Sequence, residues 1–230
     1  ADLDGSPSND NFKKGISCFR RALMHLSQDE TPQDWADAQV NLGIMLVKIN
    51  DENRQTNLAQ AIQSLEAAAT VYSKEQFPER RGKIQVALGR AYEALLTGDR
   101  VENYRTALKH YHASLQVFSL TNSPVLWGCS LGCVASFYTD LRLGSRAENL
   151  TNAATALHDA LLVFNETNHP VEWAKTMVGL GNVYVKWPTN DFPAAAARAV
   201  AAYSAASRVL SQTNYPKQWC VLEFNLGGAY

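Results

Sequence analysis

A repeat of 46 residues runs through this chain without insertion or deletion. Five prolines keep this spacing, and a tryptophan follows four of them three positions later. A fixed period of this length indicates that each repeat is one supersecondary unit that buries its apolar face against its neighbours. The prolines are Pro32, Pro78, Pro124, Pro170 and Pro216, and the residues three positions later are Trp35, Arg81, Trp127, Trp173 and Trp219.

Apolar and small residues recur every three or four positions within each repeat. In the second half of one repeat they are Ile62, Leu65, Ala68 and Tyr72. This spacing places them on one face of an α-helix, whereas a half-buried strand would need steps of two. Each repeat therefore contains two helices: a first helix that begins at the repeating proline and a second helix that follows it.

Residues that start helices or form turns mark the helix boundaries. Proline is favoured in the first helical turn, because the N–H that it lacks has no partner there. The asparagines at 11, 57, 103 and 149 suit an N-cap of the second helix. Gly98-Asp99 and Gly144-Ser145 indicate turns between the two helices. The expected first helices are 32–49, 78–97, 124–143, 170–187 and 216–230, and the expected second helices are 11–27, 57–73, 103–119, 149–165 and 195–211.

Stacked helical hairpins predict an all-α fold. The expected architecture is a right-handed α-solenoid of about ten antiparallel helices in five repeats. Glycine and alanine in the small positions would let the helices approach closely. We expect residues 1–10 to form a flexible leader and residues 11–230 to form the repeat domain. Its repeats are 11–56, 57–102, 103–148, 149–194 and the partial repeat 195–230.

The sequence resembles the tetratricopeptide repeat family at a short motif. Leu88-Gly89 is followed by Tyr92 in the first helix and by Ala107 and Tyr111 in the second. Leu180-Gly181 and Tyr184 repeat the beginning of this motif. The usual unit of that family is shorter, about 34 residues. The long repeat is similar to those found beside caspase-like CHAT protease domains.

The resemblance implies a non-catalytic scaffold that binds a peptide or protein on a concave surface formed by the first helices. Lys83, Arg90, Lys175 and Asn182 are candidates for contacting a partner's carboxylates, and small neutral residues of the third repeat separate them. A solvated groove with no specific partner remains the alternative. Carried over position by position, the partner-binding residues are Val40, Ile44, Lys83, Val86, Arg90, Ser136, Lys175 and Asn182.

Two motifs suggest chemistry, and the repeat explains both. Residues 128–132 match G-x-S-x-G, but a nucleophile elbow needs a strand before its turn, and this stretch falls inside an expected helix. Cys129 and Cys133 share a helix face, yet a structural zinc site needs two more ligands. We therefore expect no catalytic residue, no metal and no cofactor, and we interpret the cysteines as small packed side chains.

Composition limits the partners and the compartment. The net charge of −1 argues against broad nucleic-acid binding, which depends on clustered cations. No apolar run approaches the about 20 residues of a membrane span, so membrane insertion is not expected. The four cysteines favour a reducing compartment and hence a cytoplasmic location. The sequons at Asn149 and Asn165 matter only in a secreted protein.

The terminal helices suggest a second hypothesis. The expected order begins with a second helix and ends with a first helix, whose Leu226 and Tyr230 precede no polar cap. An exposed apolar end of a repeat array indicates a partner, a continuing chain or another copy. The alternative function is therefore a structural subunit that assembles head-to-tail through its terminal helices.

Overall fold

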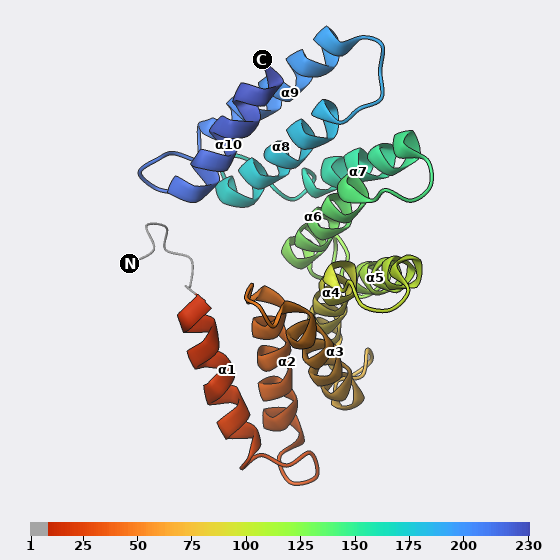
Figure 1. The fold of residues 1–230 in the computed structure, drawn as a ribbon, viewed down its shortest axis with the longest axis vertical. Helices are drawn as coiled ribbons and strands as arrows, with labels where there is room; N and C mark the ends of the chain where they lie inside the picture. The colour runs from red at the N-terminus through yellow and green to blue at the C-terminus, as the bar shows by residue number, and fades with distance from the viewer. Residues whose placement is uncertain (1–8) are drawn as a thin grey trace. The chain divides into compact units, whose positions relative to one another are not determined.

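The computed structural model describes residues 9–230, and every regular element in that range is an α-helix (Figure 1). The predicted all-α class is therefore confirmed, with ten helices in the described chain. The first helices are α2 (Pro32–Lys48), α4 (Pro78–Ala94), α6 (Pro124–Asp140), α8 (Pro170–Val185) and α10 (Pro216–Ala229). The second helices are α1 (Asn9–Leu23), α3 (Arg54–Val71), α5 (Arg100–Leu115), α7 (Arg146–Ala160) and α9 (Phe192–Ser207).

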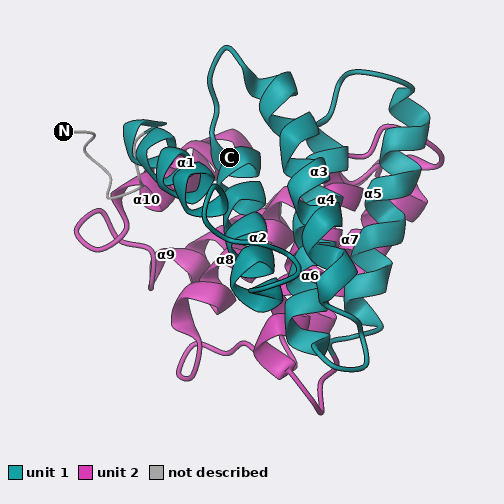
Figure 2. Cartoon of the chain, turned by 90° about the horizontal axis from the view of Figure 1, so that it is seen from below, with its two compact units in different colours: residues 1–118 teal, residues 119–230 magenta. Residues whose placement is uncertain are grey.

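The chain divides into two compact units between Phe118 and Ser119 (Figure 2). Unit 1 holds α1 to α5, and unit 2 holds α6 to α10. Within each unit, neighbouring helices pack in chain order, and successive first helices also touch. Each unit is thus a stack of helical hairpins. The unit boundary falls inside the expected repeat 103–148, which α5 and α6 share.

The repeating prolines begin the first helices as predicted, but the N-cap role of the repeating asparagines is wrong. Helix α5 begins three residues earlier, and the Asp99 carboxylate accepts the backbone N–H groups of its first turn. Asn103 instead donates its side-chain amide to the carbonyls of Leu95 and Thr97, at 3.2 and 2.9 Å. The asparagine therefore binds the end of the preceding helix. It does not start its own.

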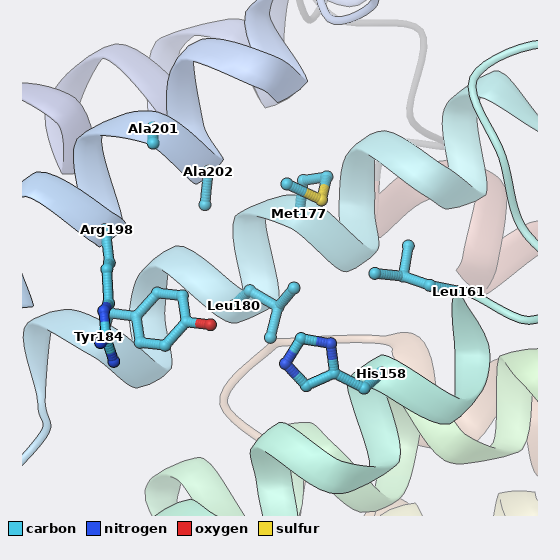
Figure 3. Close-up of a pocket in the computed structure, with 8 residues that line it drawn as sticks. All are labelled: His158, Leu161, Met177, Leu180, Tyr184, Arg198, Ala201 and Ala202. Atoms are coloured by element: carbon cyan, nitrogen blue, oxygen red, sulfur yellow. The ribbon is translucent and has the colours of Figure 1, made fainter.

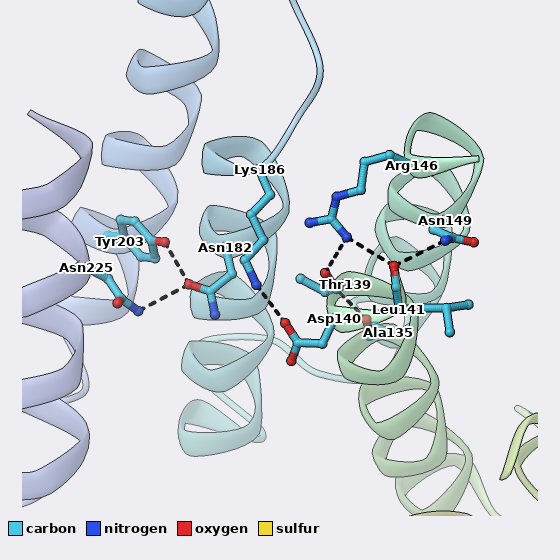
Figure 4. Close-up of polar contacts among 10 residues, drawn as sticks. All are labelled: Ala135, Thr139, Asp140, Leu141, Arg146, Asn149, Asn182, Lys186, Tyr203 and Asn225. Atoms are coloured by element: carbon cyan, nitrogen blue, oxygen red, sulfur yellow. Dashed lines mark hydrogen bonds and ion pairs between the residues drawn. The ribbon is translucent and has the colours of Figure 1, made fainter. Parts of the chain in front are cut away.

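An arginine row joins the two helices of three hairpins, and the sequence analysis missed it. Arg54, Arg100 and Arg146 each begin a second helix and donate to carbonyls at the end of the preceding first helix. The Arg146 guanidinium lies 2.8 Å from the Thr139 carbonyl oxygen (Figure 4). These carbonyls have no partner within their own helix and carry partial negative charge. In the α8–α9 hairpin the equivalent residue is Phe192, which is exposed.

Small residues on α2, α4 and α8 receive a large side chain from the following second helix. A Cβ at Gly89 would lie 2.6 Å from the Tyr111 ring, and one at Gly181 would meet the Tyr203 ring equally closely. Both tyrosines are fully buried. This packing confirms the predicted close helix approach, because no side chain could occupy the glycine positions without displacing a ring.

A second repeating contact lies near the start of α4 and of α6. A side chain that follows the second helix of the same hairpin covers the small residue there. The pairs are Gly82 with Phe118 in unit 1 and Gly128 with Phe164 in unit 2. The tryptophans lie next to this contact, where Trp35 and Trp173 are partly buried against the cores of their units. Their predicted structural role is thus seen in both units.

Three smaller predictions need correction. Asn9 and Asp10 belong to α1, so the expected leader is too long by these residues; its first eight residues lie outside the described range. The helices end one to five residues before the expected positions, because the chain turns there. None of the four cysteines, all within the described residues, forms a disulfide, and Cys18, Cys129 and Cys220 are exposed, so the predicted packed thiols are wrong for these three.

Candidate functional site

Five of the predicted partner-binding residues lie in unit 1. Val40 and Ile44 on α2 are half-buried and pack against the core that α2 shares with α4. On α4, Val86 is half-buried, whereas Lys83 and Arg90 are exposed. The two cations stand seven residues apart, which places them on the same face two turns apart. The apolar predicted residues therefore support the frame, and the cations are the accessible ones.

Lys83 already has an ion-pair partner on its own helix. Its Nζ lies 2.5 Å from the Glu79 carboxylate one turn earlier, and both side chains are about half exposed. Such a surface pair adds at most about 1 kcal/mol to stability. The pair thus holds the ammonium above α4. A partner that takes the place of Glu79 loses little free energy by breaking this pair.

The other three predicted residues lie in unit 2. Ser136 on α6 and Lys175 on α8 are exposed. Asn182 is half-buried, and its Oδ1 accepts hydrogen bonds from the Tyr203 hydroxyl at 2.7 Å and from the Asn225 amide at 3.1 Å (Figure 4). Asn182 thereby links α8 to α9 and α10. Burial raises the pKa of Tyr203 to about 12, so its hydroxyl stays protonated and donates at neutral pH.

The structure therefore divides the predicted surface between the two units and does not place it as one continuous site. In unit 2 a further polar contact joins successive hairpins: the Lys186 ammonium lies 2.7 Å from the Asp140 carboxylate (Figure 4). In unit 1 the Arg80 guanidinium pairs with Asp37 and lies over the Tyr72 ring. In the sequence, each of these pairs consists of opposite charges in neighbouring repeats. This spacing could have predicted both contacts.

Four polar side chains from α3, α4 and α5 contact one another in unit 1. The His110 ring donates a 2.7 Å hydrogen bond from its Nδ1–H to the Gln85 amide oxygen and stacks on Tyr92, with ring centres 5.5 Å apart. The Tyr92 hydroxyl donates to Glu66 at 3.2 Å. Burial, with the nearby charges of Lys109 and Arg81, lowers the pKa of His110 below its usual value. The ring is therefore neutral at physiological pH.

The equivalent place in unit 2, between α7, α8 and α9, is open. It forms a pocket of about 340 Å³ with an apolar floor and three polar side chains at its edge (Figure 3). Sequence reasoning missed this pocket, since its residues fall in two repeats and only Leu180 and Tyr184 belong to the repeat motif. The residues that line it are His158, Leu161, Met177, Leu180, Tyr184, Arg198, Ala201 and Ala202.

The residues of the two chemical motifs lie in a helix. Ser130 of the G-x-S-x-G stretch is buried in the middle of α6, and its hydroxyl donates to the Leu126 carbonyl at 2.9 Å. This geometry is not that of a nucleophile elbow. Across residues 9–230 no three His, Cys, Asp or Glu side chains come together as metal ligands would. In the same range no helix is both long and apolar enough to cross a bilayer.

Comparison of the chain with models of known protein families finds no match, and comparison with curated proteins finds no similar sequence. The helical-repeat architecture therefore stands on the structure itself. The likeness to tetratricopeptide repeats rests on the residues of the repeat motif, and the functional assignment is built on the geometry described above.

Proposed function

We propose that this protein is a non-catalytic scaffold of the tetratricopeptide type, which binds a peptide or protein partner on its first helices. One observation carries this proposal: α4 presents Lys83 and Arg90 on one face, while the neighbouring Gly89 is packed against buried Tyr111. The cations therefore project from a helix whose position is fixed by its core. Because the backbone of α4 is already ordered, binding costs only the conformational entropy of the side chains.

The chemistry of these side chains favours a partner that carries carboxylates. Arginine binds a carboxylate through two parallel hydrogen bonds, and lysine contributes a point charge beside it. Lys175, exposed on α8, provides the corresponding cation in unit 2. Each unit would then contact its own acidic segment, so the proposal does not require one groove along the whole chain.

Charge removal on α4 tests the proposal. A partner is captured by cross-linking to the purified chain, identified by mass spectrometry and then titrated in purified form. Arg90→Ala and Lys83→Ala should each weaken its binding about 10- to 100-fold, since charged hydrogen bonds are each worth about 1.5–3 kcal/mol. Arg105→Ala on α5, also an exposed cation of unit 1, should leave the affinity unchanged. Equal affinity for the α4 variant and this control would overturn the assignment.

A specific feature of α10 favours a second candidate, self-association. In the described structure a Cβ at Gly227 meets no atom within 4 Å, although the equivalent Gly181 is covered by Tyr203. Phe224 on the same helix and Tyr230 directly after it are 82% and 87% exposed. We propose that α1 of a second copy covers this face. Its Phe19 is only half-buried and stands at the repeat position of Tyr203.

Light scattering over a wide concentration range separates the two candidates. Self-association predicts a mass that rises with concentration, and Phe224→Ser should abolish that rise. Leu96→Ser, which removes an exposed apolar side chain from unit 1, is the control and should leave it intact. A chain that stays monomeric at the highest concentration rules out the head-to-tail assembly and leaves the partner-binding scaffold unaffected.

A further inference from the structure

The pocket of unit 2 has a filled counterpart in unit 1, two repeats earlier in the sequence. The order and pairing of the helices are the same: a first helix packs against two second helices, and a tyrosine of the first helix stands at the same position in both. The side chains around that tyrosine differ. The equivalent residues are Tyr92 and Tyr184, Gln85 and Met177, and His110 and Ala202.

Loss of one ring opens the pocket. In unit 1 the His110 imidazole stacks on Tyr92 with its plane only 13° from parallel, and so it occupies the space beside that tyrosine. In unit 2 the side chain at that position is the single methyl group of Ala202, and the space beside Tyr184 is empty (Figure 3). The hollow therefore has room for a planar ring at the place where unit 1 carries its own.

The polar groups at the edge differ as well. In the counterpart Tyr92 donates to the carboxylate of Glu66. In unit 2 the same position carries His158, and Arg198 has been added where unit 1 has a threonine. Among the described residues, the side chains of Arg198, His158 and Tyr184 make no hydrogen bond or ion pair with one another or with the rest of the chain. The edge thus offers donors and a positive charge without an internal acceptor.

We propose that this pocket binds a planar aromatic carboxylate. The aromatic ring lies on the apolar floor beside Tyr184, in the place of the missing imidazole, and gains from ring stacking and burial. The carboxylate pairs with the Arg198 guanidinium at one end of the pocket, while the Tyr184 hydroxyl and His158 face the other end (Figure 3). A volume of about 340 Å³ suits a ligand of one or two rings.

This ligand chemistry has two sources: a small aromatic acid, or the free carboxylate of a peptide that ends in an aromatic residue. The site lies between α7, α8 and α9 and uses none of the residues proposed to bind a partner on α4. Failure of one proposal therefore leaves the other standing.

Isothermal titration with indole-3-propionate tests the pocket directly. The wild-type chain should bind one equivalent with a micromolar to low millimolar Kd, and the neutral amide of the same compound should bind about tenfold more weakly. Ala202→His, which restores the ring of unit 1, should weaken binding at least tenfold. Ala197→His adds the same ring at an exposed position of α9 and should bind as the wild type does.

Arg198→Thr provides a variant that does not disturb packing, because Arg198 is exposed and the counterpart carries threonine. It should reduce the affinity for the acid to that for the amide, whereas Arg142→Thr, at an exposed site of the same unit, should change neither. No binding by the wild type at millimolar ligand, or equal binding by the wild type and Ala202→His, overturns the proposal. Tighter binding of a peptide with a C-terminal tryptophan than of indole-3-propionate assigns the ligand to a partner's terminus, and the reverse order assigns it to a free acid.

Discussion

The regions beside Tyr92 in unit 1 and Tyr184 in unit 2 have the same helix order and differ in the side chains around the tyrosine. The first is filled by His110, which is hydrogen-bonded to Gln85; the second is a pocket of about 340 Å³ beside Ala202. The contact of Gly89 with Tyr111 in unit 1 recurs as that of Gly181 with Tyr203 in unit 2. A repeat fold thus separates two requirements: one set of positions holds the hairpins together, and another varies the surface without altering the frame.

The largest expected effect concerns what the two units share. Tyr111→Ala and Tyr203→Ala should each lower the free energy of unfolding by about 3–5 kcal/mol, because each removes a fully buried ring packed against a glycine. Urea denaturation of the two variants measures this. Tyr203→Phe, which removes only the hydrogen bond to Asn182, should cost about 1 kcal/mol. A loss near 1 kcal/mol for either alanine variant would show that the glycine–tyrosine contact does not stabilise both units.

Adding a methyl group at the glycines should have a smaller effect. Gly89→Ala and Gly181→Ala should each cost about 1–3 kcal/mol, since the new Cβ meets a buried tyrosine ring. Gly132→Ala on α6 is the control, because no described atom lies within 4 Å of its Cβ position. There the better helix propensity of alanine should stabilise the chain by up to about 1 kcal/mol. Thermal unfolding should therefore give a lower Tm for Gly89→Ala and Gly181→Ala and a higher Tm for Gly132→Ala.

The difference between the units can be reversed at His110. His110→Ala should destabilise the chain by about 1–3 kcal/mol, because it leaves the Gln85 amide, only 6% exposed, without its partner. Adding Gln85→Met copies unit 2 and removes that unsatisfied group, so the double variant should recover about 1 kcal/mol. A double-mutant cycle in urea gives the coupling. Strict additivity would mean that the hydrogen bond contributes nothing.

The smallest effect should appear in the pH dependence of stability. The pKa of His110 is lowered in the folded state, first by burial and then by Lys109 and Arg81, so the unfolded chain binds the proton more readily. This contribution is fully present above the unfolded pKa of about 6.5 and is lost as the pH falls through the folded value. Urea midpoints at pH 7.5 and pH 5.5 measure it. His110→Ala should show a weaker loss on acidification than the wild type, and an identical loss would assign the effect to other groups.

The sequence predicted the helices well because each one repeats the same pattern. The prolines fixed the starts of the first helices, and the small positions predicted the contacts at Gly89 and Gly181. The asparagines gave a wrong prediction. A polar residue near a helix start has the same sequence pattern whether its side chain caps its own helix or binds the preceding one. Asn103 does the latter.

The candidate site was less predictable. Lys83 and Arg90 follow from position within the repeat, but the structural hydrogen bonds of Asn182 depend on Tyr203 and Asn225, which lie on other helices. The pocket depends on what is missing at Ala202, and an alanine in a helix carries no signal of its own. Only alignment of one repeat against another, at the level of side-chain volume, could have revealed it.

The glycine and tyrosine contacts join positions only 22 residues apart, 89 with 111 and 181 with 203. A growing polypeptide can therefore complete each contact soon after both helices leave the ribosome, without waiting for distant segments. Folding that depends on such local contacts is fast and exposes little apolar surface along the way. A partly synthesised chain would then already contain folded hairpins, and each new hairpin would pack against the one before it.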